Sequence, residues 1–291
     1  MANVNHSIRK VVDAFVREPV AAVELDRVPL RIVCDRSRDY SLNSKVETMR
    51  LLTLLALFCL TACDTQSADD TLQSAPDSAA QIIADCAEAL GGVEELENLR
   101  TFRTTASWDG NDPVVSDIQR PNLFRTFGRA SMVFDGERAA MLGGPQENEE
   151  AGGPELLDAE VWKDFEIDLA FNFPAFFDYP AEYLGLDSLD GTPVQQLLVT
   201  LPLGSRMTYL IDANTHLPLA ARTAVTIDGT DYTPERRYLE FREVEGLLFP
   251  SRFRQGWTPE TAQTGVLQEA EVNVMFDADH FRIPAELLEG R

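Results

Sequence analysis

The pattern of hydrophobic and polar positions begins with one clear helix. Over residues 78–90 apolar side chains recur at three- and four-residue spacing on one face. Ser78 is a good N-cap, and Gly91-Gly92 supplies the residue type that usually ends a helix. A further half-turn is expected at 93–96. The pattern therefore predicts an amphipathic helix followed by a sharp break.

Beyond Leu99 the pattern changes to that of strands separated by turns. The expected strands cover residues 102–108, 123–127, 132–134, 139–142, 184–189, 194–201, 207–211, 217–227, 238–241, 249–257 and 265–276. Asp-Gly and similar turn signals recur between them, which is typical of an antiparallel meander. A second helix is expected over 154–173. We predict a mainly β protein with α (α+β), in which two or three helices cover one large curved antiparallel sheet.

One segment ahead of this domain has the pattern of an export signal. Residues 49–62 combine a basic start, an apolar run and small residues ahead of Cys63. The run is too short to span a bilayer as a helix, which needs roughly 20 apolar residues, and it fits a signal peptide. Its end, Leu60-Thr61-Ala62-Cys63, is similar to the lipobox of bacterial lipoproteins, in which the cysteine is lipidated. A buried helix in an ordinary domain is the alternative.

The residues on either side of this signal are interpreted accordingly. Residues 63–77 are rich in Asp, Ser, Thr and Ala and are expected to form a flexible tether. Residues 1–48 show no sustained periodicity, and we expect them to be a disordered, mis-annotated extension, with translation beginning at Met49. A genuine cytoplasmic extension is the alternative, and amino-terminal sequencing of the native protein distinguishes the two.

Composition excludes several classes of partner. The chain has 48 acidic and 25 basic residues, a net charge of −23. A nucleic-acid binder needs a clustered excess of Lys and Arg, so no nucleic-acid partner is expected. The same acidity argues against electrostatic docking on an anionic membrane. Membrane attachment would therefore depend on acyl chains on Cys63.

The sequence has no recognisable catalytic or metal-binding motif. No nucleophile elbow, Walker loop, dinucleotide fingerprint or zinc-protease motif occurs. His216 and His280 have no second ligand at metal spacing, and Cys86 is expected to be a small core residue. Acid pairs such as Asp187 and Asp190 are expected by chance in so acidic a chain. We predict no metal, no cofactor and no enzymatic activity.

Aromatic residues are spread through the predicted sheet and the helix that covers it. They either fill a core or line an apolar cavity of the kind that takes a lipid or acyl chain. The candidates for a ligand-binding cavity are Phe102, Trp108, Phe124, Phe134, Trp162, Phe165, Phe176 and Phe253.

Several stretches, in order, resemble the superfamily of LolA/LolB-type lipoprotein carriers and outer-membrane lipoprotein-sorting-like proteins. Residues 87–102 are similar to that family's opening helix, double glycine and first strand. Residues 120–125 (Arg-Pro-Asn-Leu-Phe-Arg) and 133–137 are similar to its "Arg-Pro…Phe-Arg" strand and Asp-Gly hairpin. Residues 210–218 and 238–250 are similar to two later hairpins.

The resemblance implies an unclosed half-barrel over residues 78–291, with an apolar pocket between its strands and helices. Together with the lipobox-like segment ending at Cys63, it indicates a protein of the bacterial cell envelope that is lipid-anchored and faces the periplasm, with inner or outer membrane left open. We also expect a monomer. The pocket would bind a lipid or the acyl chain of a lipoprotein, in lipoprotein or lipid trafficking. No single transfer residue maps onto this chain.

Two other functions remain open at this point. The first is an envelope hydrolase, which would need two buried acids facing one cleft about 5–10 Å apart. The second is a purely structural lipoprotein whose pocket is fully packed.

Overall fold

The computed structural model describes residues 78–128, 130–143, 153–227 and 230–289. The predictions for residues 1–48, 49–62 and 63–77, including lipidation of Cys63, lie outside these residues.

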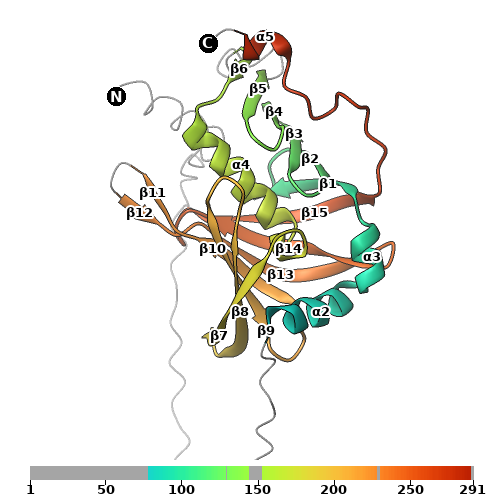
Figure 1. The fold of residues 1–291 in the computed structure, drawn as a ribbon, viewed down its shortest axis with the longest axis vertical. Helices are drawn as coiled ribbons and strands as arrows, with labels where there is room; N and C mark the ends of the chain where they lie inside the picture. Colours follow the sequence, from blue (N-terminus) through green and yellow to red (C-terminus); the bar gives the residue numbers. More distant parts are fainter. Residues whose placement is uncertain (1–77, 129, 144–152, 228–229, 290–291) are drawn as a thin grey trace, which may run out of the picture. The chain divides into compact units, whose positions relative to one another are not determined.

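One large antiparallel sheet dominates the described residues (Figure 1). Its thirteen strands are β1 (Thr101–Trp108), β2 (Val114–Gln119), β3 (Leu123–Phe127), β4 (Ser131–Phe134), β5 (Ala139–Gly143), β6 (Glu155–Leu156), β7 (Ala181–Leu189), β8 (Thr192–Thr200), β9 (Arg206–Asp212), β10 (Pro218–Thr223), β13 (Glu235–Val244), β14 (Leu247–Gly256) and β15 (Gln263–Val272). A separate hairpin pairs β11 (Val225–Ile227) with β12 (Thr230–Tyr232).

The strand order runs β6-β5-β4-β3-β2-β1-β15-β14-β13-β10-β9-β8-β7. Two meanders are therefore joined where β1 pairs with β15, the first strand of the domain with the last. The outer strands β6 and β7 do not pair with each other, so the sheet is not closed. This confirms the predicted fold class, a mainly β domain built on an unclosed antiparallel sheet.

Short helices accompany the sheet. They are α2 (Ala79–Leu90), α3 (Val93–Asn98), α4 (Ala159–Asn172), α5 (Ala285–Leu288) and the 3-10 turn η2 (Ala175–Phe177). The first predicted helix is confirmed, because the Ser78 hydroxyl accepts a hydrogen bond from the Gln81 amide at 3.2 Å and Gly91 ends α2 at φ 132°. Helix α4 lies in the hollow of the sheet (Figure 1). Its buried side chains, among them Phe165 and Phe171, belong to the main hydrophobic core.

The register gives β1–β4 two chemically different faces. The inner row, which belongs to the main hydrophobic core, consists of Phe102, Ile118, Phe124 and Phe134. The outer row, made of the residue next to each of these in its strand, consists of Arg103, Asp117, Arg125 and Val133. Side chains alternate between the two faces along a strand. Because the inner row packs into the core, the neighbouring residues of the outer row must lie on the opposite face of the sheet.

The outer row is covered by the end of the chain. Residues 274–289, here called the C-terminal strap, cross this face and bring Phe281 and Ile283 against Val133 and Ala140 in a second buried cluster. Strands β2, β4 and β5 therefore have buried residues on both faces. The sequence did not predict this cover.

Several predicted elements differ from the structure. Strand β2 was not expected, and the helix predicted from residue 154 begins only at Ala159. Its first residues form β6 instead, because Leu156 pairs with Ala140. The strand expected over 217–227 is divided into β10 and β11, and the last strand ends at Val272 rather than at residue 276.

Candidate functional site

All eight aromatic candidates meet in the main hydrophobic core. Six are buried in it and two, Trp108 and Trp162, are partly buried against it. The rings contact one another directly: Phe134 stacks on Phe165 with centroids 6.4 Å apart, and Trp108 meets Phe253 edge-on at 5.1 Å. None of the eight lines either of the two pockets described below. Their role as ligand-binding residues stays a prediction.

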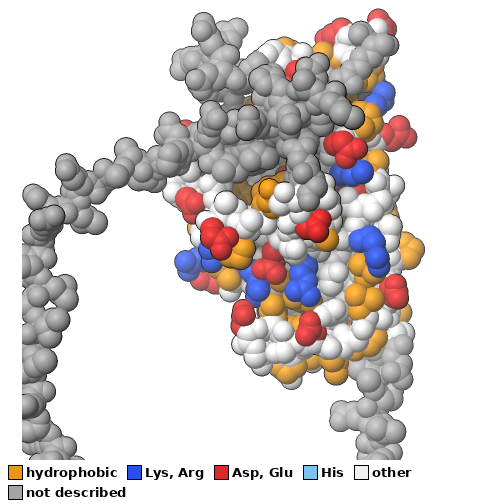
Figure 2. Space-filling model, turned by 90° about the vertical axis from the view of Figure 1, so that its left-hand side faces the viewer, with side chains coloured by type: hydrophobic (Ala, Val, Ile, Leu, Met, Phe, Trp, Pro, Cys, Tyr) orange, Lys and Arg blue, Asp and Glu red, His pale blue; other side chains and the backbone are white. Residues whose placement is uncertain are grey.

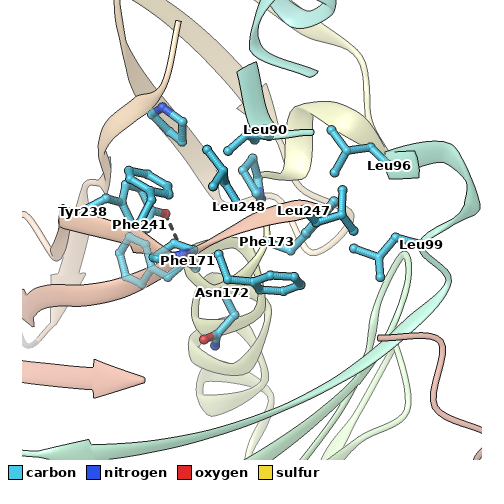
Figure 3. A pocket seen from close by; sticks show the side chains of 14 residues that line it. Leu90, Leu96, Leu99, Phe171, Asn172, Phe173, Tyr238, Phe241, Leu247 and Leu248 are labelled. Carbon is cyan, nitrogen blue, oxygen red and sulfur yellow. Dashed lines mark hydrogen bonds between the residues drawn. The ribbon is translucent and has the colours of Figure 1, made fainter. Parts of the chain in front are cut away.

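The apolar pocket lies where α2 and α3 meet the end of α4 and the β13–β14 turn (Figure 3). Its lining residues are Leu90, Leu96, Leu99, Phe171, Asn172, Phe173, Pro174, Pro218, Tyr238, Phe241, Leu247, Leu248, Phe249 and Pro250. It leaves about 30 Å³ for the centres of water-sized molecules, which is room for about two or three waters. Side chains therefore fill most of the hollow between sheet and helices.

Two buried tyrosines hold the end of α4 next to this pocket. The Tyr238 hydroxyl donates to the Phe171 carbonyl at 2.9 Å, and the Tyr209 hydroxyl donates to the Ala170 carbonyl at 2.9 Å. The last carbonyl groups of a helix have no partner inside the helix, so these bonds satisfy groups that would otherwise be buried alone. Burial raises the pKa of both hydroxyls, which keeps them neutral donors.

Arg120 ties α3 to the rest of the protein. Its Nη1 donates to the Leu96 and Leu99 carbonyls at 2.5 and 2.7 Å, and its Nη2 forms an ion pair with Asp178 at 2.8 Å. The guanidinium also lies 4.3 Å from the centre of the Phe173 ring. Because Leu96, Leu99 and Phe173 line the apolar pocket, Arg120 holds one of its walls in place.

A smaller, polar pocket lies on the other side of Arg120. It is lined by Arg120, Pro121, Asn122, Glu166, Leu169, Ala170, Phe173, Ala175, Asp178, Tyr179 and Leu201. Glu166 accepts a hydrogen bond from the Leu203 amide at 2.7 Å through Oε1, and burial raises the pKa of this carboxyl. Glu166 and Asp178 are thus two acids on one pocket, but Asp178 is already bonded to Arg120. Asp178 is therefore not free to act as a carboxylate base beside Glu166.

A second polar cluster lies outside the sheet, under the C-terminal strap. Asp117, fully buried, forms an ion pair with Arg103 at 2.6 Å and a hydrogen bond with His280 Nε2 at 2.7 Å. The His280 ring stacks on Phe276 with centroids 4.6 Å apart, and its carbonyl accepts from Arg125 at 2.7 Å. His280 therefore packs against Phe276 and holds the C-terminal strap to the sheet through Asp117 and Arg125.

Three further observations concern metal ions, the Cys86 thiol and membrane-spanning helices. Within the described ranges, no group of three or more His, Cys, Asp or Glu side chains could hold a metal ion. Cys86 is a buried core residue, and burial raises the pKa of its thiol to about 12. No helix in the described part of the chain is both long and apolar enough to cross a membrane.

The visible surface mixes both signs of charge. On the face drawn in Figure 2, basic and acidic side chains alternate, with hydrophobic ones between them. The excess of acids therefore does not gather into a single acidic patch on that face.

The residues that line the apolar pocket were not singled out from the sequence. Leu247 and Leu248 are ordinary strand residues, and Leu96 and Leu99 are ordinary helix and loop residues. They meet because α2 ends against the β13–β14 turn, where a Cβ on Gly91 would overlap the Gly246 carbonyl oxygen. In the sequence, the Gly91-Gly92 pair is the feature from which this close approach of two backbones could have been predicted.

Comparison with known proteins finds likeness in structure only. Neither a scan against protein-family models nor a search of curated proteins gives a match.

Three solved structures are similar to this chain. A LolA superfamily protein from Nitrosomonas europaea is 12% identical, with 69% of this chain and 96% of that chain covered and a TM-score of 0.43. A DUF1329 family protein from Desulfovibrio piger is 11% identical, with 70% and 96% covered and a TM-score of 0.43. A putative outer membrane lipoprotein-sorting protein domain from Vibrio parahaemolyticus is 7% identical, with 69% and 95% covered and a TM-score of 0.44.

Proposed function

We propose that this chain is a lipid-anchored protein of the bacterial cell envelope that faces the periplasm and binds an apolar ligand. The ligand is a lipid or the acyl chain of a lipoprotein, and the setting is lipoprotein or lipid trafficking. The observation that carries the proposal is the apolar pocket, which is lined by leucine, phenylalanine and proline side chains beside the core of an unclosed sheet. Concave, apolar sites with few polar groups are the usual sites for such ligands.

The size of the pocket sets a condition on this function. Room for about two or three waters does not hold an acyl chain, so a ligand must displace side chains or move a wall. The wall that is simplest to move is α3, a helix of six residues between the Gly91-Gly92 break and the Arg120 hydrogen bonds. Ligand binding would then break the hydrogen bonds between Arg120 and α3, and the apolar surface of the ligand buried in the pocket would offset their loss.

The proposal is tested on the whole chain with Cys63→Ser, which removes the predicted lipidation site. We expect native mass spectrometry and lipid extraction of the purified protein to find a co-purifying lipid. Binding of a fluorescent fatty acid should be abolished by Leu248→Glu, because the substitution places a charge in the apolar pocket.

The matched control is Leu239→Glu on the neighbouring strand, where the side chain is exposed. It should leave ligand binding unchanged. A protein with no bound lipid and no affinity for the fluorescent fatty acid would contradict the proposal and favour the structural lipoprotein.

A further inference from the structure

Arg236, on β13, is a cation buried in the core. The residue is 3% exposed, and its guanidinium carbon lies 5.8, 5.6 and 4.5 Å from the ring centres of Trp108, Phe171 and Phe253. Contacts with aromatic faces stabilise a cation, but a buried charge without a paired anion is costly. This position therefore favours an anionic partner.

Two other arginines that are at least partly buried, Arg103 and Arg120, have such a partner. Arg103 and Arg120 form ion pairs with Asp117 and Asp178 at 2.6 and 2.8 Å. For Arg236, no carboxylate oxygen in the described ranges lies within the 4.0 Å limit of an ion pair. Arg236 thus differs from both in its lack of a directly bonded anion.

Neutral amides occupy the positions around the Arg236 guanidinium. Nε donates to Gln255 Oε1 at 2.6 Å and Nη1 donates to Asn172 Oδ1 at 3.0 Å. Both amides donate in turn to Asp168, Gln255 to its carboxylate at 3.0 Å and Asn172 to its carbonyl at 2.9 Å. Asp168 is therefore linked to Arg236 only through these two amides and does not bond to it directly. The Nη2 atom of Arg236 has no hydrogen bond to a side chain among the described residues.

The guanidinium and the apolar pocket share a wall. Asn172 and Phe171 line the pocket, and both contact or face Arg236. In Figure 3 the Asn172 amide points away from the leucines of the pocket. A hydrocarbon chain that fills the pocket would thus have only the Asn172 side chain between its end and the buried Arg236 guanidinium.

We infer that Arg236 binds the carboxylate of a long-chain fatty acid whose hydrocarbon chain occupies the apolar pocket. This inference rests on the proposed function. One carboxylate oxygen takes the place of Asn172 Oδ1 on Nη1, and the other accepts from Nη2, so the two oxygens match the arginine fork. No group is transferred and no bond in the ligand is broken.

The charges around Arg236 favour a carboxylate over a doubly charged phosphate. Asp168 already lies within range of the guanidinium, so each added negative charge is opposed by its carboxylate. Burial raises the pKa of Asp168, which eases its neutralisation when a ligand carboxylate enters. Removing the Asp168 charge should therefore strengthen carboxylate binding.

The experiment measures acid preference in the full chain with Cys63→Ser. Hexadecanoic acid and hexadecanol compete for the protein with the neutral fluorescent probe N-phenylnaphthylamine, and the ratio of their dissociation constants is recorded. We expect the acid to bind at least tenfold more tightly than the alcohol, because charged hydrogen bonds contribute more than neutral ones. Arg236→Met should abolish this preference and retain hexadecanol binding, and Asp168→Asn should increase the preference.

The control variant is Arg242→Met, an exposed arginine on the same strand, which should leave the ratio unchanged. Equal binding of acid and alcohol by the parent chain would overturn the inference and leave the proposed function intact. Failure of the probe and both ligands to bind would reject both. If Arg236→Met does not fold, an unchanged or reduced preference in Asp168→Asn overturns the inference.

Discussion

Asp164 lies one helical turn before Asp168 on α4, so the two carboxylates share one side of the helix. Burial, the nearby Asp168 and Glu160 together raise the pKa of Asp164 from 3.8 to about 7. The charged form of this side chain is therefore disfavoured in the folded protein. Helix α4 therefore carries a carboxyl group that titrates near neutral pH and that forms no ion pair within the described residues.

The first prediction is a pH dependence of stability. Between about pH 4 and pH 7 the folded protein keeps a proton on Asp164 that the unfolded chain has lost. The contribution of Asp164 to the free energy of unfolding therefore falls as the pH rises through this range. Asp164→Asn removes the contribution. Urea unfolding at pH 4.5 and 7.5 should show the variant gaining stability relative to the parent at the higher pH. An exposed control, Asp112→Asn, should show no such change.

At the scale of elements, the junction of α2 and α3 depends on a close backbone approach. Gly91 has φ 132°, a conformation that side-chain-bearing residues rarely adopt, and a Cβ there would overlap the Gly246 carbonyl oxygen. Helix α2 can therefore reach the β13–β14 turn only with glycine at this position. The same contact forms one end of the apolar pocket.

Gly91→Ala should therefore lower the free energy of unfolding by about 2–4 kcal/mol, since strain and a backbone clash act together. Gly110→Ala is the matched control: its φ is also positive, at 78°, but no atom lies within 4 Å of the added Cβ. That variant should lose only about 1 kcal/mol. Chemical denaturation measures both, and equal losses would show that the approach of α2 to the turn is unimportant.

The elements that could be predicted are those with local signals. Helix α2 has apolar periodicity, a serine cap and a glycine end within its own sequence. Strand β2 has Asp117 in its middle, and this buried acid is tolerated there because Arg103 neutralises its charge and the distant His280 forms a hydrogen bond with it. The aromatic core could likewise be predicted, whereas the pocket could not, since it needs the α2–α3 junction and the β13–β14 turn to meet.

At the scale of the whole domain, the C-terminal strap connects the end of the chain to its first strands. Phe281 and Ile283 are buried against β4 and β5, and His280 reaches Asp117 on β2. The N-terminal half of the sheet is therefore completed by residues from the other end of the sequence.

Phe281→Ala should cost about 3–5 kcal/mol of unfolding free energy, the usual loss for a buried phenyl ring. The matched control in the strap is Met275→Ala, because Met275 is 96% exposed and should change stability by about 0.5 kcal/mol at most. Thermal unfolding compares the two variants with the parent. If Phe281→Ala were as stable as Met275→Ala, the strap would be a surface appendage.

The pairing of β1 with β15 also decides when the protein can fold. Phe102 pairs with Val272, so the centre of the sheet joins residues that are far apart in sequence. Such long-range contacts must close a large loop before they stabilise anything, and proteins rich in them fold slowly. The central strands of a nascent chain therefore have exposed edges until β15 has been synthesised. The central pairing of the half-barrel therefore forms late in folding, and until it forms the open strand edges are exposed to proteases and to aggregation.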